Sequence, residues 1–338
     1  MSNVVLITLA HSPDPDDVFM WWPITGMIQP PSHEQAQQVV PARVMSKPEL
    51  DTGRFRFVSI ASDIAALNRR AIATGDLDVT AISMNCYASV AAKYQLTCFG
   101  SSMGFGYGPK LVGRAGQTEK QPSTLASPVC YADEPGIGDN AAISLPEDAL
   151  VAIPGRETTA FLLLSMMLGE LRSRVRFVEM PFDRILDAAA SGEGGVTHGL
   201  LIHQSQLTFA QLGLELVADV GDWWLKQTGL PLPLGGNAVR RDLDALHGAG
   251  TTTEVVRLLN ASLRYAMEHR ERSMDYCVHF APEVTRAQAE RYIQMYVNDL
   301  TVDAGEMGEQ AVARLLSEGN RLGLCPDAGE IHMLRPLG

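Results

Sequence analysis

The order of short apolar runs and helical segments is the feature that most narrows what this chain can fold into. Short apolar runs recur along the sequence, and each precedes a segment with apolar residues at the helical period. The first two of these units are 4–10 followed by 18–24, and 54–60 followed by 63–72. Strands that alternate with helices predict an α/β fold with mainly parallel sheets.

The same alternation continues further along the chain. A strand near 78–82 leads through Ser83 into a helix that is expected to run through Tyr94. Later units pair a strand at 149–153 with a helix at 161–171, and the chain after about 242 is predicted to be helical.

Two segments rich in glycine and proline divide these units. Glycines alternate along 100–109, and prolines and glycines punctuate 229–236, so we interpret both segments as crossings between domains. The chain of 338 residues is also long enough for about two domains. We therefore predict a larger discontinuous α/β domain formed by 1–107 plus 236–338, an inserted smaller α/β domain formed by 108–235, and a ligand cleft between them.

The composition excludes several classes of protein. A net charge of −12 argues against a nucleic-acid partner, because phosphate binding needs clustered Lys and Arg. The apolar runs are too short to span a membrane, and the N-terminus lacks the pattern of a signal peptide, so a cytoplasmic location is expected. The segment 115–147 has little periodicity and is predicted to be a surface insertion. We expect reduced thiols, with no disulfide or zinc role, at the widely spaced Cys86, Cys98, Cys130, Cys277 and Cys325.

One histidine is the leading candidate for a functional side chain. His203 follows the apolar run 199–202, which is predicted to be a buried strand. Ligands of open α/β sheets bind beyond the carboxyl ends of the strands, where such a residue lies. A lone histidine is more often a packed core residue. Here the loops 12–17, 104–108 and 156–159 also follow predicted strands and favour a position in the cleft.

The start of the helix after 149–153 is a candidate anion site. Thr158 and Thr159 lie where free backbone N–H groups and hydroxyls could hold a carboxylate. An equally good interpretation is that a threonine caps the helix. The tryptophans Trp223 and Trp224 are expected to belong to the core rather than to a ligand platform.

Several blocks together resemble one enzyme family. Residues 153–160 (Ile-Pro-Gly-Arg-Glu-Thr-Thr-Ala), 201–205 (Leu-Ile-His-Gln-Ser) and 221–235 are similar to the 1,4-dihydroxy-6-naphthoate synthase family of the futalosine pathway to menaquinone. The loop 12–17 matches the Ser-Pro-x-Pro-x-Asp loop of that family. Tyr296-Val-Asn298 and the stretch that begins at Val302 also look like it. The resemblance covers most of the chain, apart from the segments around 28–50 and 115–147.

The resemblance implies a two-domain fold of the periplasmic-binding-protein type (type II). It also implies a carbon–carbon lyase that converts cyclic dehypoxanthinylfutalosine to 1,4-dihydroxy-6-naphthoate, with no metal or redox cofactor, because aromatisation drives the cleavage. His203 aligns with the cleft histidine that acts as the base in the family, a role that suits a group with a pKa near neutrality. The partner is a small-molecule carboxylate substrate. The predicted substrate-binding residues are Ser12, Asp16, Asp17, Ser83, Asn85, Gly106, Tyr107, Arg156, Thr158 and Thr159.

Four positions depart from the family pattern. Asp16 stands where a typical member has Asn, and Ala81 stands where many have Lys. Gln204-Ser205-Gln206 replaces the common Glu-Ser-Arg. These changes make the predicted cleft less cationic, so an anionic substrate needs other donors, such as Arg156.

Two alternatives to this lyase stay open at the level of the sequence. One is a solute-binding protein without chemistry that holds a small carboxylate, because fold alone does not determine function. The other is a related enzyme of the same superfamily with a changed substrate, such as the chorismate dehydratase of the pathway. The block that contains His203 and the Trp-Trp and Pro-Leu-Pro block favour the synthase. The sequence does not determine the oligomeric state.

Overall fold

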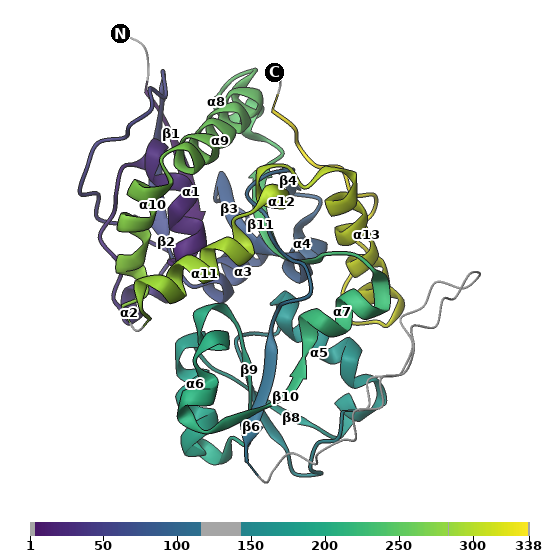
Figure 1. Ribbon diagram of the computed structural model, residues 1–338. Helices are drawn as coiled ribbons and strands as arrows, with labels where there is room; N and C mark the ends of the chain where they lie inside the picture. Colours follow the sequence, from purple (N-terminus) through teal and green to yellow (C-terminus); the bar gives the residue numbers. More distant parts are fainter. Residues whose placement is uncertain (1–3, 116–142, 283, 337–338) are drawn as a thin grey trace.

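Two α/β lobes, each formed around its own sheet, make up the protein (Figure 1). This computed structural model describes residues 4–115, 143–282 and 284–336. The predicted insertion at 115–147 therefore lies largely outside the described residues, as does Cys130.

The first lobe contains a six-stranded sheet with the order β2–β1–β3–β11–β4, in which β5 also pairs with β11. Strand β1 runs parallel to β2 and β3, whereas β11 runs antiparallel to β3, β4 and β5. The strands are β1 (Val5–His11), β2 (Phe55–Ala61), β3 (Val79–Ser83), β4 (Tyr94–Leu96), β5 (Ser102–Gly104) and β11 (Leu232–Arg240).

The second lobe contains a five-stranded sheet with the order β10–β6–β9–β7–β8. Strand β7 is parallel to β8 and β9, and β6 is antiparallel to β9 and β10. The strands are β6 (Lys110–Arg114), β7 (Leu150–Ile153), β8 (Arg176–Glu179), β9 (His198–Leu201) and β10 (Leu214–Asp219). Both sheets are mixed, so the expectation of mainly parallel sheets is wrong. The strands that follow the crossings, β6 and β11, enter their sheets in the reverse direction.

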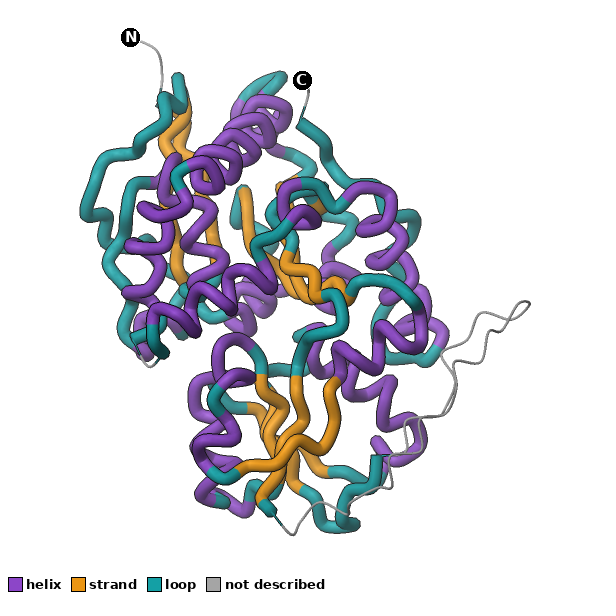
Figure 2. Tube along the Cα trace, in the orientation of Figure 1, coloured by secondary structure: helices purple, strands orange, loops and turns teal. Residues whose placement is uncertain are grey.

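Helices cover the sheets of both lobes, as the tube drawing shows in purple (Figure 2). They are α1 (Pro15–Thr25), α2 (His33–Ala36), α3 (Ile64–Ala73), α4 (Met84–Val90), α5 (Thr159–Leu168), α6 (Phe182–Ser191), α7 (Val220–Thr228), α8 (Leu243–His247), α9 (Thr251–Glu268), α10 (Arg270–Cys277), α11 (Arg286–Tyr296), α12 (Asp299–Val302) and α13 (Gly305–Arg321).

The expected helix through Tyr94 is wrong, because α4 ends at Val90 and Tyr94 begins strand β4. The Tyr94 ring is fully buried, and its hydroxyl donates to the carbonyl oxygen of Leu77 over 2.9 Å. An aromatic side chain packed on a pleated sheet is a common stabilising contact, and here it outweighs the helical pattern.

Helix α1 fixes the loop that precedes it. All of its residues are buried, and Pro15 at its start has the backbone geometry that a first helical turn requires. The Trp22 indole donates to the Ser273 hydroxyl over 3.0 Å, which attaches α1 to α10. A wholly buried helix has little freedom to shift, so the polar loop at its N-terminus is held rigidly.

The two tryptophans predicted to belong to the core do so in the structure. Trp223 and Trp224 in α7 are buried, and the Trp224 indole donates to the carbonyl oxygen of Pro231. The four described cysteines are free and buried.

In the described part of the chain, no helix has both the length and the apolar character needed to cross a membrane. The domain limits at 107, 108, 235 and 236 stay a prediction.

Candidate active site

A pocket lies between the two lobes. The first lobe supplies the loop before α1, the end of β3 and two tyrosines of α11, and the second lobe supplies the start of α5 and the turn after β9. The polar side chains that line it are Ser12, Asp14, Asp16, Asp17, Ser83, Ser102, Thr158, Thr159, His203, Gln206, Tyr292 and Tyr296.

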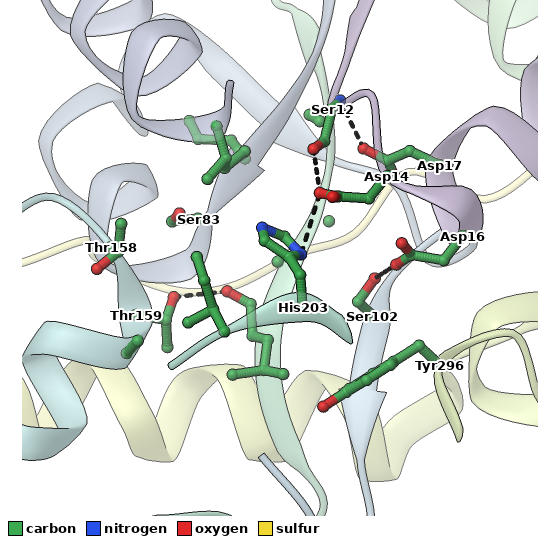
Figure 3. Close-up of a pocket in the computed structure, with 18 of the residues that line it drawn as sticks. Ser12, Asp14, Asp16, Asp17, Ser83, Ser102, Thr158, Thr159, His203 and Tyr296 are labelled. Atoms are coloured by element: carbon green, nitrogen blue, oxygen red, sulfur yellow. Dashed lines mark hydrogen bonds and ion pairs between the residues drawn. The ribbon is translucent and has the colours of Figure 1, made fainter. Parts of the chain in front are cut away.

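His203 lies near the middle of this pocket (Figure 3). It begins a short 3-10 turn directly after β9 and has a φ of 56°, the only positive φ of a non-glycine residue in the described chain. This backbone conformation is costly for most side chains, and such residues cluster at functional sites. The imidazole Nδ1 is 3.0 Å from Asp14 Oδ2 and 3.4 Å from the Tyr292 hydroxyl. Nε2 is buried and has no hydrogen-bond partner.

The loop before α1 holds its carboxylates with hydrogen bonds. The Ser12 hydroxyl donates to Asp14 Oδ2, and the Ser12 backbone N–H donates to Asp17 Oδ2 over 2.8 Å. The Ser102 hydroxyl donates to Asp16 Oδ2 over 2.9 Å, while Asp16 Oδ1 is buried without a partner. Figure 3 shows these carboxylates on one side of His203, with Thr158, Thr159 and Ser83 on the other.

Burial and mutual repulsion control the charges of these groups. Burial lowers the pKa of His203, but the charge and hydrogen bond of Asp14 and the charge of Asp16 outweigh it, so the pKa rises from 6.5 to about 9. Burial, together with repulsion from Asp14, raises the pKa of Asp16 to about 6. Burial and repulsion from Asp16 hold the pKa of Asp17 well above its usual range. At pH 7 the His203 ring is therefore mainly protonated, and its proton-accepting form appears as the pH rises toward about 9.

The paired threonines have specific partners within the protein. The Thr158 hydroxyl accepts from the backbone N–H of Phe161 over 3.3 Å, so it caps α5, as the alternative interpretation predicted. The Thr159 hydroxyl donates to the carbonyl oxygen of Leu234 over 2.6 Å and accepts from the N–H of Asn85 over 3.3 Å. Both threonines line the pocket, and the helix start supplies the backbone N–H groups that an anion needs.

Four of the predicted substrate-binding residues do not line the pocket: Asn85, Gly106, Tyr107 and Arg156. The Asn85 amide donates to the carbonyl oxygens of Arg156 and Thr158, so it supports the loop before α5. The Tyr107 hydroxyl donates to the carbonyl oxygen of Met295. Gly106 is on the crossing and has a φ of 78°.

Arg156 was expected to help bind an anionic substrate, but its side chain does not line the pocket. Its side chain is 51% exposed, and Nε is 2.9 Å from Glu179 Oε1 on β8. No Lys or Arg is among the described residues that line the pocket, so His203 is the basic side chain there. Within the described ranges, no group of three or more His, Cys, Asp and Glu side chains is arranged to hold a metal ion.

Sequence reasoning did not select Asp14, Ser102 or Tyr292 as site residues. Asp14 lies within the loop 12–17, which follows a predicted strand, so its position near the cleft is predictable from the sequence. Tyr292 belongs to α11, in the part of the chain for which the sequence predicts only helices, and the fold brings its hydroxyl to His203.

Comparison with known proteins shows the family. The sequence pattern of a protein family described as "Menaquinone biosynthesis" matches residues 7–321. The chain belongs to this menaquinone biosynthesis family. It is 33% identical over 318 residues to the 1,4-dihydroxy-6-naphthoate synthase of Thermus thermophilus, covering 94% of this chain and 95% of that protein. It is 29% identical over 325 residues to the enzyme of the same name from Streptomyces coelicolor, covering 96% of each chain.

Comparison with solved structures shows which fold the chain shares with other proteins. A crystal structure of an Archaeoglobus fulgidus protein has 33% identity and a TM-score of 0.69, covering 94% of this chain and 98% of that chain. The alkanesulfonate-binding protein of Xanthomonas axonopodis pv. citri has 11% identity and a TM-score of 0.58, covering 98% of both chains. The predicted periplasmic-binding-protein-like fold and the resemblance to the synthase family are both confirmed for this member of the menaquinone biosynthesis family.

Proposed function

We propose that this protein is a carbon–carbon lyase that converts cyclic dehypoxanthinylfutalosine to 1,4-dihydroxy-6-naphthoate, with His203 as the base. The observation that carries the proposal is the buried, unpartnered Nε2 of His203 in a pocket between two lobes. A proton acceptor has to be within hydrogen-bond reach of the substrate, and this atom has no competing partner among the described residues. The reaction needs no metal or redox cofactor, because aromatisation of the product drives it.

The two sides of the pocket suit different parts of a carboxylate substrate. The start of α5, next to Ser83, offers backbone N–H groups and a partial positive charge to the carboxylate. His203 lies between this end and the end with Asp16. We propose Ser12, Asp16, Asp17, Ser83, Thr158 and Thr159 as substrate-binding residues, whereas Asn85, Gly106, Tyr107 and Arg156 support the site from outside the pocket.

The direct test is incubation of the protein with cyclic dehypoxanthinylfutalosine, followed by absorbance and mass spectrometry of the products. We expect 1,4-dihydroxy-6-naphthoate to accumulate over many turnovers. Substrate that binds and is recovered unchanged, under conditions where the Thermus thermophilus enzyme turns it over, would contradict the proposal. That outcome would instead support a solute-binding protein, since the fold is shared with such proteins.

We expect Thr159→Val to raise KM about fivefold and to change kcat less. The hydroxyl holds the start of α5 against Leu234, and the loss of one hydrogen bond costs about 1 kcal/mol of binding if substrate and transition state are bound equally. Steady-state kinetics would measure both constants, with Thr159→Ser as a control that keeps the hydroxyl. An unchanged KM would show that the hydroxyl serves only the junction between the lobes.

We also expect ligand binding to make the molecule more compact. His33 Nδ1 on α2 is 2.7 Å from Asp183 Oδ2 on α6, so this contact joins the two lobes. Both side chains are nearly half exposed, and such a pair contributes only about 0–1 kcal/mol. A bound ligand that contacts both lobes would add to this pair and to the His203–Asp14 contact between the lobes, and would shift the protein toward closure. Small-angle X-ray scattering should show a smaller radius of gyration with product bound, and identical profiles would count against closure.

A further inference from the structure

We propose that Asp14 is a positioning residue for His203, whose carboxylate accepts a hydrogen bond from Nδ1–H and thereby leaves Nε2 as the proton-accepting atom. This inference rests on the proposed function, because it concerns the same histidine. It assigns a role to a carboxylate that sequence reasoning did not select. The step is a proton transfer: a substrate proton moves to Nε2, and Asp14 stabilises the imidazolium that forms.

Asp14 lies at the start of α1 but its side chain does not cap this helix. An aspartate at the N-cap of a helix ordinarily accepts a hydrogen bond from a backbone N–H in the first turn. Asp14 occupies the N-cap of α1 but makes no such bond. Its carboxylate instead faces His203 from the other lobe, with Oδ2 at 3.0 Å from Nδ1. The Asp14 side chain therefore contacts His203 instead of capping α1.

The surroundings of Asp14 hold its carboxylate in place. The side chain is only 3% exposed, so water does not replace its hydrogen bonds. The Ser12 hydroxyl donates to the same oxygen that faces Nδ1, which restricts rotation of the carboxylate. A buried carboxylate that holds one imidazole nitrogen is the arrangement that fixes the tautomer of a catalytic histidine.

Other groups near His203 have different partners. Asp16 accepts from Ser102, and Asp17 accepts from the backbone of Ser12. Asp63 caps α3 through the N–H of Ala65 over 2.7 Å. The carboxylates of Asp16 and Asp63 help to raise the pKa of His203, while the Tyr292 hydroxyl of α11 lies 3.4 Å from Nδ1. Of these groups, Asp14 has the direct carboxylate contact with the ring and is the largest of the influences that raise this pKa.

Two substitutions of Asp14 distinguish its effect on the tautomer of His203 from the effect of its negative charge. In Asp14→Asn, the amide can donate to Nδ1, which stabilises the tautomer with its proton on Nε2 and removes the base. In Asp14→Ala, the carboxylate that favours the tautomer with its proton on Nδ1 is removed, and no amide replaces it. Both changes remove the group that does most to raise the pKa of His203, so burial should bring that pKa at least one pH unit below about 9.

The test is kcat/KM across pH 5–10 for the wild type, Asp14→Ala and Asp14→Asn. Because the base form of His203 appears above its pKa, wild-type activity should rise with pH up to about 9. In both variants the rise should shift at least one unit lower. On the high-pH plateau we expect the order wild type, then Asp14→Ala, then Asp14→Asn, with the last reduced roughly a hundredfold. An unchanged pH midpoint, or equal plateaus for the wild type and Asp14→Asn, would overturn the proposal.

A second readout does not depend on activity. Nitrogen-15 NMR of labelled histidine reports the tautomer and the pKa of His203 in the ligand-free protein. We expect the neutral wild-type ring to carry its proton on Nδ1 and the Asp14→Asn ring to carry it on Nε2. Equal tautomers in both proteins would overturn the role of Asp14. A tautomer change in a protein without lyase activity would instead contradict only the proposed function. Thermal unfolding of each variant confirms that it is folded.

Discussion

Replacing His203 should reduce kcat at least about a hundredfold, because removal of a positioned general base typically costs that factor or more. The clearest variant is His203→Asn. Asparagine tolerates the positive φ at this position, and its amide can still donate to Asp14, so the buried carboxylate keeps a partner. His203→Ala should lose as much activity. It should also be less stable, because it leaves the buried Asp14 without its ion-pair partner.

His332→Ala is the matched control for this experiment. Its side chain is 68% exposed and distant in sequence from the pocket, so kcat and KM should stay within about twofold of wild type. Steady-state naphthoate formation measures the rates, and product binding by the variants shows that the pocket is intact. Full activity in a folded His203→Asn would remove this histidine from the mechanism.

Gly221→Ala should destabilise the protein by about 3 kcal/mol. A Cβ atom on Gly221 would lie 2.1 Å from the carbonyl carbon of Tyr107 and 2.3 Å from the backbone nitrogen of Gly108. Both atoms belong to the backbone of the crossing between the lobes, so they cannot move aside as a flexible side chain can. Overpacking of this kind typically costs about 1–3 kcal/mol, and contact with rigid backbone favours the upper end.

The measurement is urea unfolding followed by tryptophan fluorescence, with Gln227→Ala on the exposed side of α7 as the control. The control should change the free energy of unfolding by less than about 0.5 kcal/mol. Gly221 does not have a positive φ, so alanine is allowed there on conformational grounds and would favour the helix. An unchanged or higher midpoint for Gly221→Ala would show that the crossing is not closely packed at this point.

The alternation of strands and helices was predictable from the sequence because each unit is local. The period of the apolar residues places β1, β2 and α3 within a residue or two of their observed bounds. The direction of β6 and β11 in their sheets was not predictable from that period. It depends on how the chain returns from the other lobe, which is a property of the whole fold.

The residues of the candidate site were also only partly predictable from the sequence. His203 was predictable because it follows a buried strand, and ligand sites lie beyond strand ends. Its partner Asp14 was not selected, because an aspartate before a helix normally acts as a cap. Arg156 was expected to add positive charge to the pocket, but the fold brings Glu179 of β8 next to it. These outcomes depend on contacts between residues far apart in the sequence.

A single-turnover experiment distinguishes a lyase from a protein that only binds the substrate. The protein, in excess over cyclic dehypoxanthinylfutalosine, is quenched at intervals, and both substrate and naphthoate are quantified by mass spectrometry. We expect one equivalent of 1,4-dihydroxy-6-naphthoate from the wild type and unreacted, bound substrate from His203→Asn. Quantitative recovery of intact substrate from the wild-type protein would rule out the proposed lyase reaction and leave a binding protein without this chemistry.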